Sequence, residues 1–119
     1  MPSNDLTFEV QEGFSEKTGG KASWVVPPDL PFFEGHFPDR PILPGVAILI
    51  ITEKLLSQVF PSRALNVKEV RSAKFLAPIL PGQKVEIAIT LTKETELGVD
   101  WWVEKSEKTV AMLLLRLTA

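Results

Sequence analysis

The sequence predicts an α+β domain in which one long helix packs against several strands. Three observations predict it: an apolar run between two prolines has the length of a helix, residues 84–93 alternate between apolar and polar side chains, and breaks containing Gly or Pro separate further short apolar segments. The chain has 119 residues, which suits one hydrophobic core, so we expect a single domain over residues 1–119.

The central helix is expected from about Gly45 to Phe60. Pro44 stands at its start, where proline is favoured, and Pro61 closes the segment. Residues 46–51 are apolar on every side of such a helix. This pattern predicts a helix that is wrapped by other parts of the structure rather than one that lies on a surface.

Strands are predicted before and after this helix. Residues 84–93 place Val85, Ile87, Ile89 and Leu91 on one face, as expected of a strand covered on one side. Residues 109–117 are apolar on both faces, which suits a central strand buried above and below. Further short strands are expected at 6–11, 22–26 and 99–104, and residues 12–20 are polar and turn-like.

One loop before the helix looks suited to chemistry. Residues 32–46 contain the only histidine of the chain, His36, together with Pro38, Pro41 and Pro44. Proline restricts both its own φ and the residue before it, so this loop should be stiff. His36 would then lie near unpaired N–H groups of the helix N-terminus, which can bind a carbonyl oxygen or an anion. Proton transfer beside a polarised carbonyl is one interpretation, and a hydrogen-bonded structural histidine is the other.

Two sequence blocks here resemble a known family. The residues G-H-F-P at 35–38 with P-I-L-P-G-V at 41–46, and A-K-F-L-A-P-I-L-P-G-Q at 73–83, resemble the (3R)-3-hydroxyacyl-acyl-carrier-protein dehydratases of type II fatty acid synthesis and their relatives in aryl-polyene synthesis. The resemblance covers roughly residues 6–118. It implies a hotdog fold, in which a curved antiparallel sheet wraps a long central helix and two subunits pair to form two active sites.

The resemblance also implies roles for single residues. His36 matches the family's catalytic histidine, and the N–H of Gly45 matches the donor that stabilises the developing charge on the thioester oxygen. By the same resemblance, the substrate is expected to contact Phe37, Pro44, Val46 and Ile50.

The family's carboxylate is missing from this chain. These dehydratases carry Glu or Asp fourteen residues after the histidine, where this sequence has Ile50. Glu53 stands three residues farther, about 60° round the helix and ~4.5 Å along it. It either replaces the missing acid or is simply the first solvated residue of the helix, an explanation that extends to Thr52 and Lys54. Glu34 and Asp39 flank the histidine and could tune it, or could be exposed loop charges.

Three functions therefore stay open. The first is an active dehydratase or hydratase that uses Glu53 or a bound water as its acid. The second is a non-catalytic subunit that binds an acyl thioester or acyl carrier, paired with a complete homologue that supplies a carboxylate across a mixed dimer. The third is another hotdog activity such as thioester hydrolysis. We favour a dehydratase-type protein of lipid metabolism, because the histidine loop and the carbonyl donor are retained together.

Composition argues against several other classes. A formal net charge of −2 gives no general attraction to nucleic acid. The absence of cysteine excludes disulfides and thiolate ligands, and a single histidine makes a metal site unexpected, so no metal or other cofactor is predicted. The N-terminal residues lack the pattern of a signal peptide, and the apolar run falls short of the ~20 residues that span a bilayer, so we expect a cytoplasmic protein without a membrane segment.

The expected partners follow from the substrate class: an acyl thioester on acyl carrier protein or coenzyme A, and a second copy in a homodimer or a larger assembly. Four cations could meet an acidic carrier or could be ordinary surface charges, namely Arg40, Lys68, Arg71 and Lys74. Trp101 and Trp102 are adjacent, so on a strand they must point to opposite faces. The outward ring could line a dimer surface or a tunnel, or could belong to the core.

Overall fold

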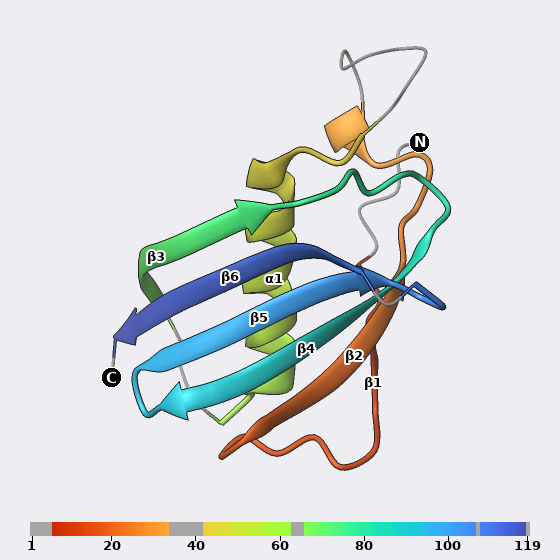
Figure 1. Cartoon of the computed structure of the whole chain (residues 1–119). Coiled ribbons are helices and arrows are strands. Elements are labelled where there is room, and N and C mark those ends of the chain that lie inside the picture. The colour runs from red at the N-terminus through yellow and green to blue at the C-terminus, as the bar shows by residue number, and fades with distance from the viewer. Residues whose placement is uncertain (1–5, 34–41, 63–65, 107, 119) are drawn as a thin grey trace.

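The computed structural model describes residues 6–33, 42–62, 66–106 and 108–118. These residues form one six-stranded sheet with one α-helix lying across a face of it (Figure 1). Along the chain the elements are β1 (Glu9–Val10), β2 (Gly19–Val25), a 3₁₀ turn (Pro31–Phe33), α1 (Gly45–Val59), β3 (Asn66–Phe75), β4 (Lys84–Lys93), β5 (Glu96–Val103) and β6 (Thr109–Thr118). The strand order is β1-β2-β4-β5-β6-β3 and every neighbouring pair is antiparallel.

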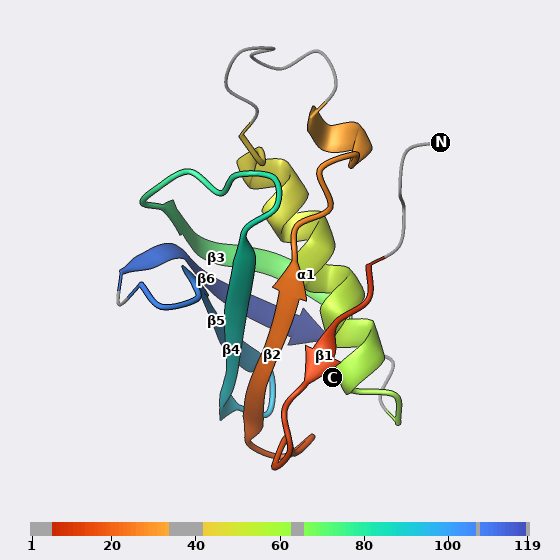
Figure 2. The same ribbon diagram turned by 90° about the vertical axis from the view of Figure 1, so that its right-hand side faces the viewer.

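The sheet curves around α1, which runs along its concave face (Figure 2). Alternate residues of the central strands point at the helix and are buried. From the sheet these are Val85, Ile87, Ile89, Leu97, Val99, Trp101, Leu113 and Leu115, and from the helix Ile48, Ile51, Leu55 and Leu56. Burying each such side chain stabilises the fold by ~1.5–3 kcal/mol. A shift of one residue in the pairing of a strand would turn its whole row of apolar side chains toward solvent. The register is therefore fixed, and the arrangement is the expected hotdog fold.

The helix follows the prediction at both ends but is not covered on every side. Its core face includes Thr52, whose hydroxyl donates to the carbonyl oxygen of Ile48 over 2.7 Å and so satisfies a buried polar group. On the side of α1 that faces away from the core, Val46 is 62% exposed and Ile50 is 37% exposed. The apolar first half of the helix thus exceeds what the described part of one chain can cover.

Several expectations about the strands need correction, the first being that β1 covers only Glu9–Val10 of the expected strand at 6–11. Residues 12–20 were expected to be turn-like, yet Gly19 and Gly20 belong to β2. Gly19 has φ +98°, and a Cβ there would collide with the backbone carbonyl of Ile89, so only glycine permits this close strand entry. Strand β6 is central but is not buried on both faces, because Met112 on the face away from α1 is 41% exposed.

Strand β3, at one edge of the sheet, was predicted only at its end, through the block that begins at Ala73. Its side chains opposite the buried row of β6 are those of Val67, Val70, Ala73 and Phe75. Val67, Val70 and Ala73 are three residues apart instead of two. The reason is that register shifts between Val67 and Glu69 and between Val70 and Ser72 each add a residue to the strand. The resulting sequence lacks the two-residue alternation by which strands are recognised.

Candidate active site

The first turn of α1 has no side-chain cap. Pro44 is the N-cap residue, with φ −64° and ψ 152°, and its carbonyl oxygen accepts hydrogen bonds from Ala47 at 3.0 Å and Ile48 at 3.1 Å. The N–H groups of Gly45 and Val46 precede these bonds and have no carbonyl partner within the helix. Since no acidic residue stands in the first turn, this end of the helix suits a carbonyl oxygen or another electron-rich ligand atom.

The two blocks of the sequence that suggested the family meet at this helix end. The N–H of Leu43 donates to the carbonyl oxygen of Ile79 over 2.9 Å, which ties the chain entering α1 to the loop that follows β3. The same loop is held to β6, because Leu76 donates to the carbonyl oxygen of Val110 over 2.8 Å. Figure 1 shows the arrowhead of β3 beside the first turn of α1. Each block therefore holds the other in place.

Phe75, the last residue of β3, packs against Gly45. A Cβ built on Gly45 would lie 2.8 Å from Cε2 of the Phe75 ring and 3.0 Å from its Cζ. The contact explains on steric grounds why glycine opens the helix. Phe75 was not among the predicted site residues, and its only signal in the sequence was its place in the second block.

Ile50 and Glu53 open into one groove between the exposed stripe of α1 and the start of β3. The groove has a volume of about 540 Å³ and is lined by Ile50, Glu53, Lys54, Leu56, Ser57, Asn66 and Val67. Glu53 is exposed, as expected of a solvated helix position. Thr52 is fully buried, so the idea that residues 52–54 emerge together into solvent is wrong for Thr52.

The histidine loop lies outside the described residues. This holds for the predicted catalytic His36, for Phe37 and for the neighbouring charges of Glu34, Asp39 and Arg40. The chain is described again from Ile42, three positions before α1 begins. The described part of the predicted site is therefore the donor end of the helix, with Pro44 as cap, Val46 exposed beside it, and Ile50 one turn along.

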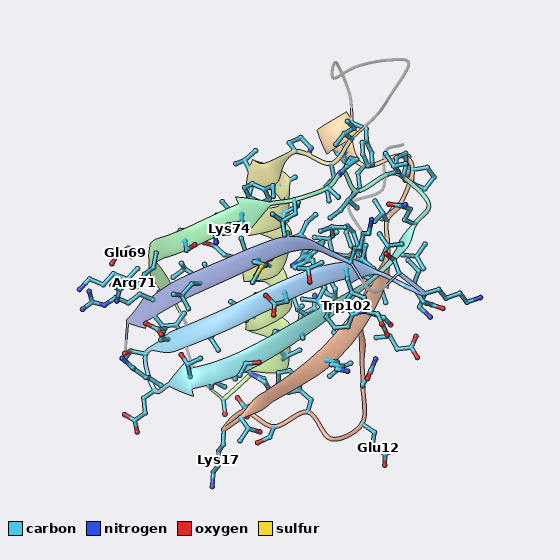
Figure 3. All side chains as sticks on the ribbon, in the orientation of Figure 1. Glu12, Lys17, Glu69, Arg71, Lys74 and Trp102 are labelled. Carbon is cyan, nitrogen blue, oxygen red and sulfur yellow. The ribbon has the colours of Figure 1, made fainter. Side chains whose placement is uncertain are left out.

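The candidate cations of β3 differ in their surroundings. Arg71 lies 3.7 Å from a carboxylate oxygen of Glu96, and Glu69 lies 3.7 Å from Arg116. In Figure 3, Glu69 and Arg71 stand toward the start of β3, whereas Lys74 lies nearer its arrowhead. Lys74 is thus the described cation of this set that stands closest along the strand to Phe75 and the start of α1.

The tryptophan pair divides between the two faces, as predicted. Trp101 is fully buried in the core, edge to face with Trp24 at 6.2 Å between ring centroids. Trp102 is on the sheet face away from α1, where its Nε1 donates to Glu86 over 2.9 Å and Lys21 lies 5.7 Å from its ring centroid. Trp102 is therefore held in a polar cluster on the opposite side of the sheet from the groove.

The described residues contain neither a metal-binding cluster nor a membrane-spanning helix. Among residues 6–33, 42–62, 66–106 and 108–118, no three His, Cys, Asp or Glu side chains stand close enough to bind a metal ion together. Within the same part of the chain, α1 and the shorter helical turn both lack the apolar length required of a membrane-spanning helix.

Comparison with known proteins places the chain among dehydratases. Residues 10–113 match the model of the ApeI-like family, described as ApeI dehydratase. The 3-hydroxyacyl-[acyl-carrier-protein] dehydratase FabZ of Proteus mirabilis is 35% identical over 72 residues, which covers 54% of this chain and 48% of that protein. The corresponding enzyme of Tolumonas auensis is 32% identical with the same coverage. The chain thus spans about half the length of the curated relatives it matches.

Solved structures agree on the fold. The dehydratase heterocomplex ApeI:P from Xenorhabdus doucetiae matches with a TM-score of 0.78 at 20% identity, covering 97% of this chain and 99% of the solved one. An uncharacterized protein from Erwinia carotovora matches with a TM-score of 0.75 at 25% identity, covering 95% and 93%. Because the family model extends over most of the sequence and the architecture agrees, this chain belongs to the ApeI-like dehydratase family.

Proposed function

We propose that this chain acts on (3R)-3-hydroxyacyl thioesters through a dehydratase-type site, giving trans-2-enoyl thioesters and water. One observation carries the proposal: α1 opens with Gly45 behind a proline that provides no side-chain cap. In a helix the first N–H groups point outward along the axis, so the N–H of Gly45 is available to a thioester oxygen that gains negative charge during the reaction. The names of the curated relatives support an acyl group carried by acyl carrier protein, and coenzyme A is the alternative carrier.

The chemistry assigns one role to each group. His36 removes a proton from C2 of the acyl chain, and the negative charge that develops is shared with the thioester oxygen bound at Gly45. The C3–O bond then breaks as the C2–C3 double bond forms. The departing hydroxyl takes up a proton from an acid and leaves as water.

The chain has no carboxylate at the position where the family carries its acid. Isoleucine at position 50 cannot donate a proton, and Glu53 is the nearest carboxylate along α1. Glu53 supports the proposal because it lines the same groove as Ile50, so a substrate lying there would be within the reach of its side chain. A water molecule held beside Glu53 would serve the same purpose.

We further propose that two copies pair along β3. Among the described residues this strand is at the sheet edge, with no strand paired on its other long side, and exposed apolar residues stand next to it on the face toward α1. They include Val46 at 62%, Val70 at 43% and Phe75 at 46% exposure. Exposed apolar groups of this size, grouped beside an open strand edge, favour contact with another protein surface.

The first experiment measures hydration of a short trans-2-enoyl thioester, the reverse reaction, by purified protein. His36→Ala should abolish turnover, and Glu53→Gln should lower it if Glu53 is the acid. Lys54→Ala is the matched control, because Lys54 lines the same groove without a carboxylate. Release of free thiol is recorded in parallel, since it would indicate thioester hydrolysis instead. Turnover that survives His36→Ala would overturn the proposal.

A second candidate function follows from Ile50 itself. An apolar residue at the acid position, exposed in the groove, favours a subunit that binds the thioester while a homologous partner supplies the carboxylate. A solved protein of similar fold, ApeI:P, is described as a dehydratase heterocomplex, which is consistent with a partner of a different chain. Ile50→Glu distinguishes the two: a silent wild type that gains hydration activity with this substitution supports the binding subunit, and an active wild type supports the enzyme.

A further inference from the structure

Phe75 occupies a position that the assigned roles leave unexplained. Three of its ring atoms, Cε2, Cζ and Cδ2, would lie 2.8, 3.0 and 3.1 Å from a Cβ on Gly45. Cβ atoms in folded proteins essentially never come as close as the shortest of these distances, so the ring edge rests directly on the Cα of Gly45. An aromatic ring from strand β3 therefore limits the position of the first peptide of α1.

The backbone that carries the ring is held in place by its neighbours. Phe75 is paired in register with Ala111, which is fully buried in β6. Immediately after it, Leu76 is bonded to Val110, and the same loop reaches the chain before α1 through Leu43 and Ile79. Backbone hydrogen bonds thus connect the segments that carry Phe75 and Gly45 through the loop that follows β3.

The rest of the ring is open. Phe75 is 46% exposed in the described chain, and Val46, which follows Gly45, is 62% exposed. A ligand atom bound at the N–H of Gly45 would therefore have an apolar aromatic surface beside it. Such a surface keeps water from one side of the donor, and a hydrogen bond to a developing negative charge is stronger where water is excluded.

We infer that Phe75 is a positioning residue for the thioester: its ring fixes the Gly45 peptide and forms one wall of the site that receives the carbonyl group. The inference rests on the proposed function, because it takes the Gly45 N–H as the carbonyl donor. It adds a size relationship, since glycine at 45 and phenylalanine at 75 are complementary. A methyl group added at position 45 requires a smaller side chain at position 75.

The test is a double-mutant cycle with Gly45→Ala, Phe75→Leu and the combined variant, and Leu76→Ala as the matched control. Leu76 is 57% exposed and adjacent in sequence, and the three atoms nearest to a Cβ at Gly45 all belong to Phe75. Each variant is measured for thermal stability, for kcat and KM in enoyl-thioester hydration, and for the dissociation constant of butyryl-pantetheine, a thioester that cannot be hydrated.

Phe75→Leu should lower kcat/KM about 10- to 100-fold, because a small displacement of a positioned group has effects of this order. Leu76→Ala should leave kcat/KM and the dissociation constant unchanged. Gly45→Ala should lose stability and activity, and adding Phe75→Leu should recover part of both. A Phe75→Leu variant that loses stability while keeping wild-type kcat, KM and dissociation constant would overturn the inference, since the ring would then only support the fold or a subunit contact.

The binding measurement separates this inference from the proposed function. If the wild type shows no turnover, the enzymatic proposal fails, and the affinity for butyryl-pantetheine still tests Phe75. Weaker binding by Phe75→Leu than by Leu76→Ala supports the positioning role, and equal binding overturns it. A wild type that binds no butyryl-pantetheine at millimolar concentration overturns both.

Discussion

The N–H of Leu43 and the carbonyl oxygen of Ile79 are 2.9 Å apart, and this single hydrogen bond joins the chain that enters α1 to the loop that leaves β3. Ile79 is only 1% exposed, whereas the next residue, Leu80, is 41% exposed. One residue of the loop thus anchors it, and its neighbour faces solvent. The pair offers a matched test of how firmly the helix start is held.

Ile79→Ala should lower the free energy of unfolding by about 2–4 kcal/mol, because it removes a buried side chain and leaves a cavity. Leu80→Ala should change it by less than ~0.5 kcal/mol, as is usual for exposed positions. Urea unfolding measures both. Comparable losses for the two variants would show that Ile79 does not anchor the loop.

Gly19 and Gly13 have nearly the same φ, +98° and +95°, but different surroundings. Alanine at Gly13 meets no neighbour and should cost only ~1 kcal/mol for the positive φ. Alanine at Gly19 would collide with the backbone of Ile89 and should cost ~3 kcal/mol or more, since the strand pair must separate. Thermal unfolding of the two variants checks the difference, and equal midpoints would contradict the close approach of β2 and β4.

Val70 and Met112 are exposed to nearly the same extent, 43% and 41%, but on opposite faces of the sheet. If two copies pair along β3 beside α1, Val70→Asp should shift the protein toward the monomer because a charge would be buried in the contact. Met112→Asp should leave the mass unchanged. Light scattering after size-exclusion chromatography measures the mass of both variants. A dimer that persists in Val70→Asp would show that the subunit contact does not involve this face of β3.

Trp102 donates to Glu86 on the face away from the groove. Trp102→Phe removes this hydrogen bond and should lower the free energy of unfolding by ~1 kcal/mol. Turnover should be unchanged, because the residue is on the other side of the sheet from α1. Glu86→Gln, which retains an acceptor oxygen, should cost less in the same unfolding assay. A large loss of kcat in Trp102→Phe would instead favour the alternative in which this ring lines a tunnel.

The helix and the central strands could be predicted closely because their signals are local. Prolines enclose α1, which ends at Val59 against an expected end near Phe60, and β4 covers Lys84–Lys93 as the alternation indicated. Some strands begin earlier than expected because their pairing extends beyond the apolar residues. Strand β5, for example, begins at Glu96 rather than at residue 99. Pairing depends on the neighbouring strand, which local patterns do not contain.

The start of α1 was predictable for the same reason, since Pro44 and Gly45 indicate a helix start from the local sequence alone, and the donor role of Gly45 stays a prediction. The contact of Phe75 with Gly45 was not, because two positions far apart in the sequence become neighbours only through the pairing of β3 with β6. The two register shifts in β3 hid that strand from the alternation on which the rest of the prediction depended.

The same two shifts have a consequence for selectivity among assemblies. A long, regular strand at a sheet edge accepts almost any extended segment and promotes aggregation. In β3 the register shifts interrupt the even ladder of backbone donors and acceptors that such an addition needs, and the charges of the lysines at 68 and 74 oppose it as well. A strand that pairs with this edge over its full length would need a matching irregularity, so the two bulges restrict which strands can add to β3.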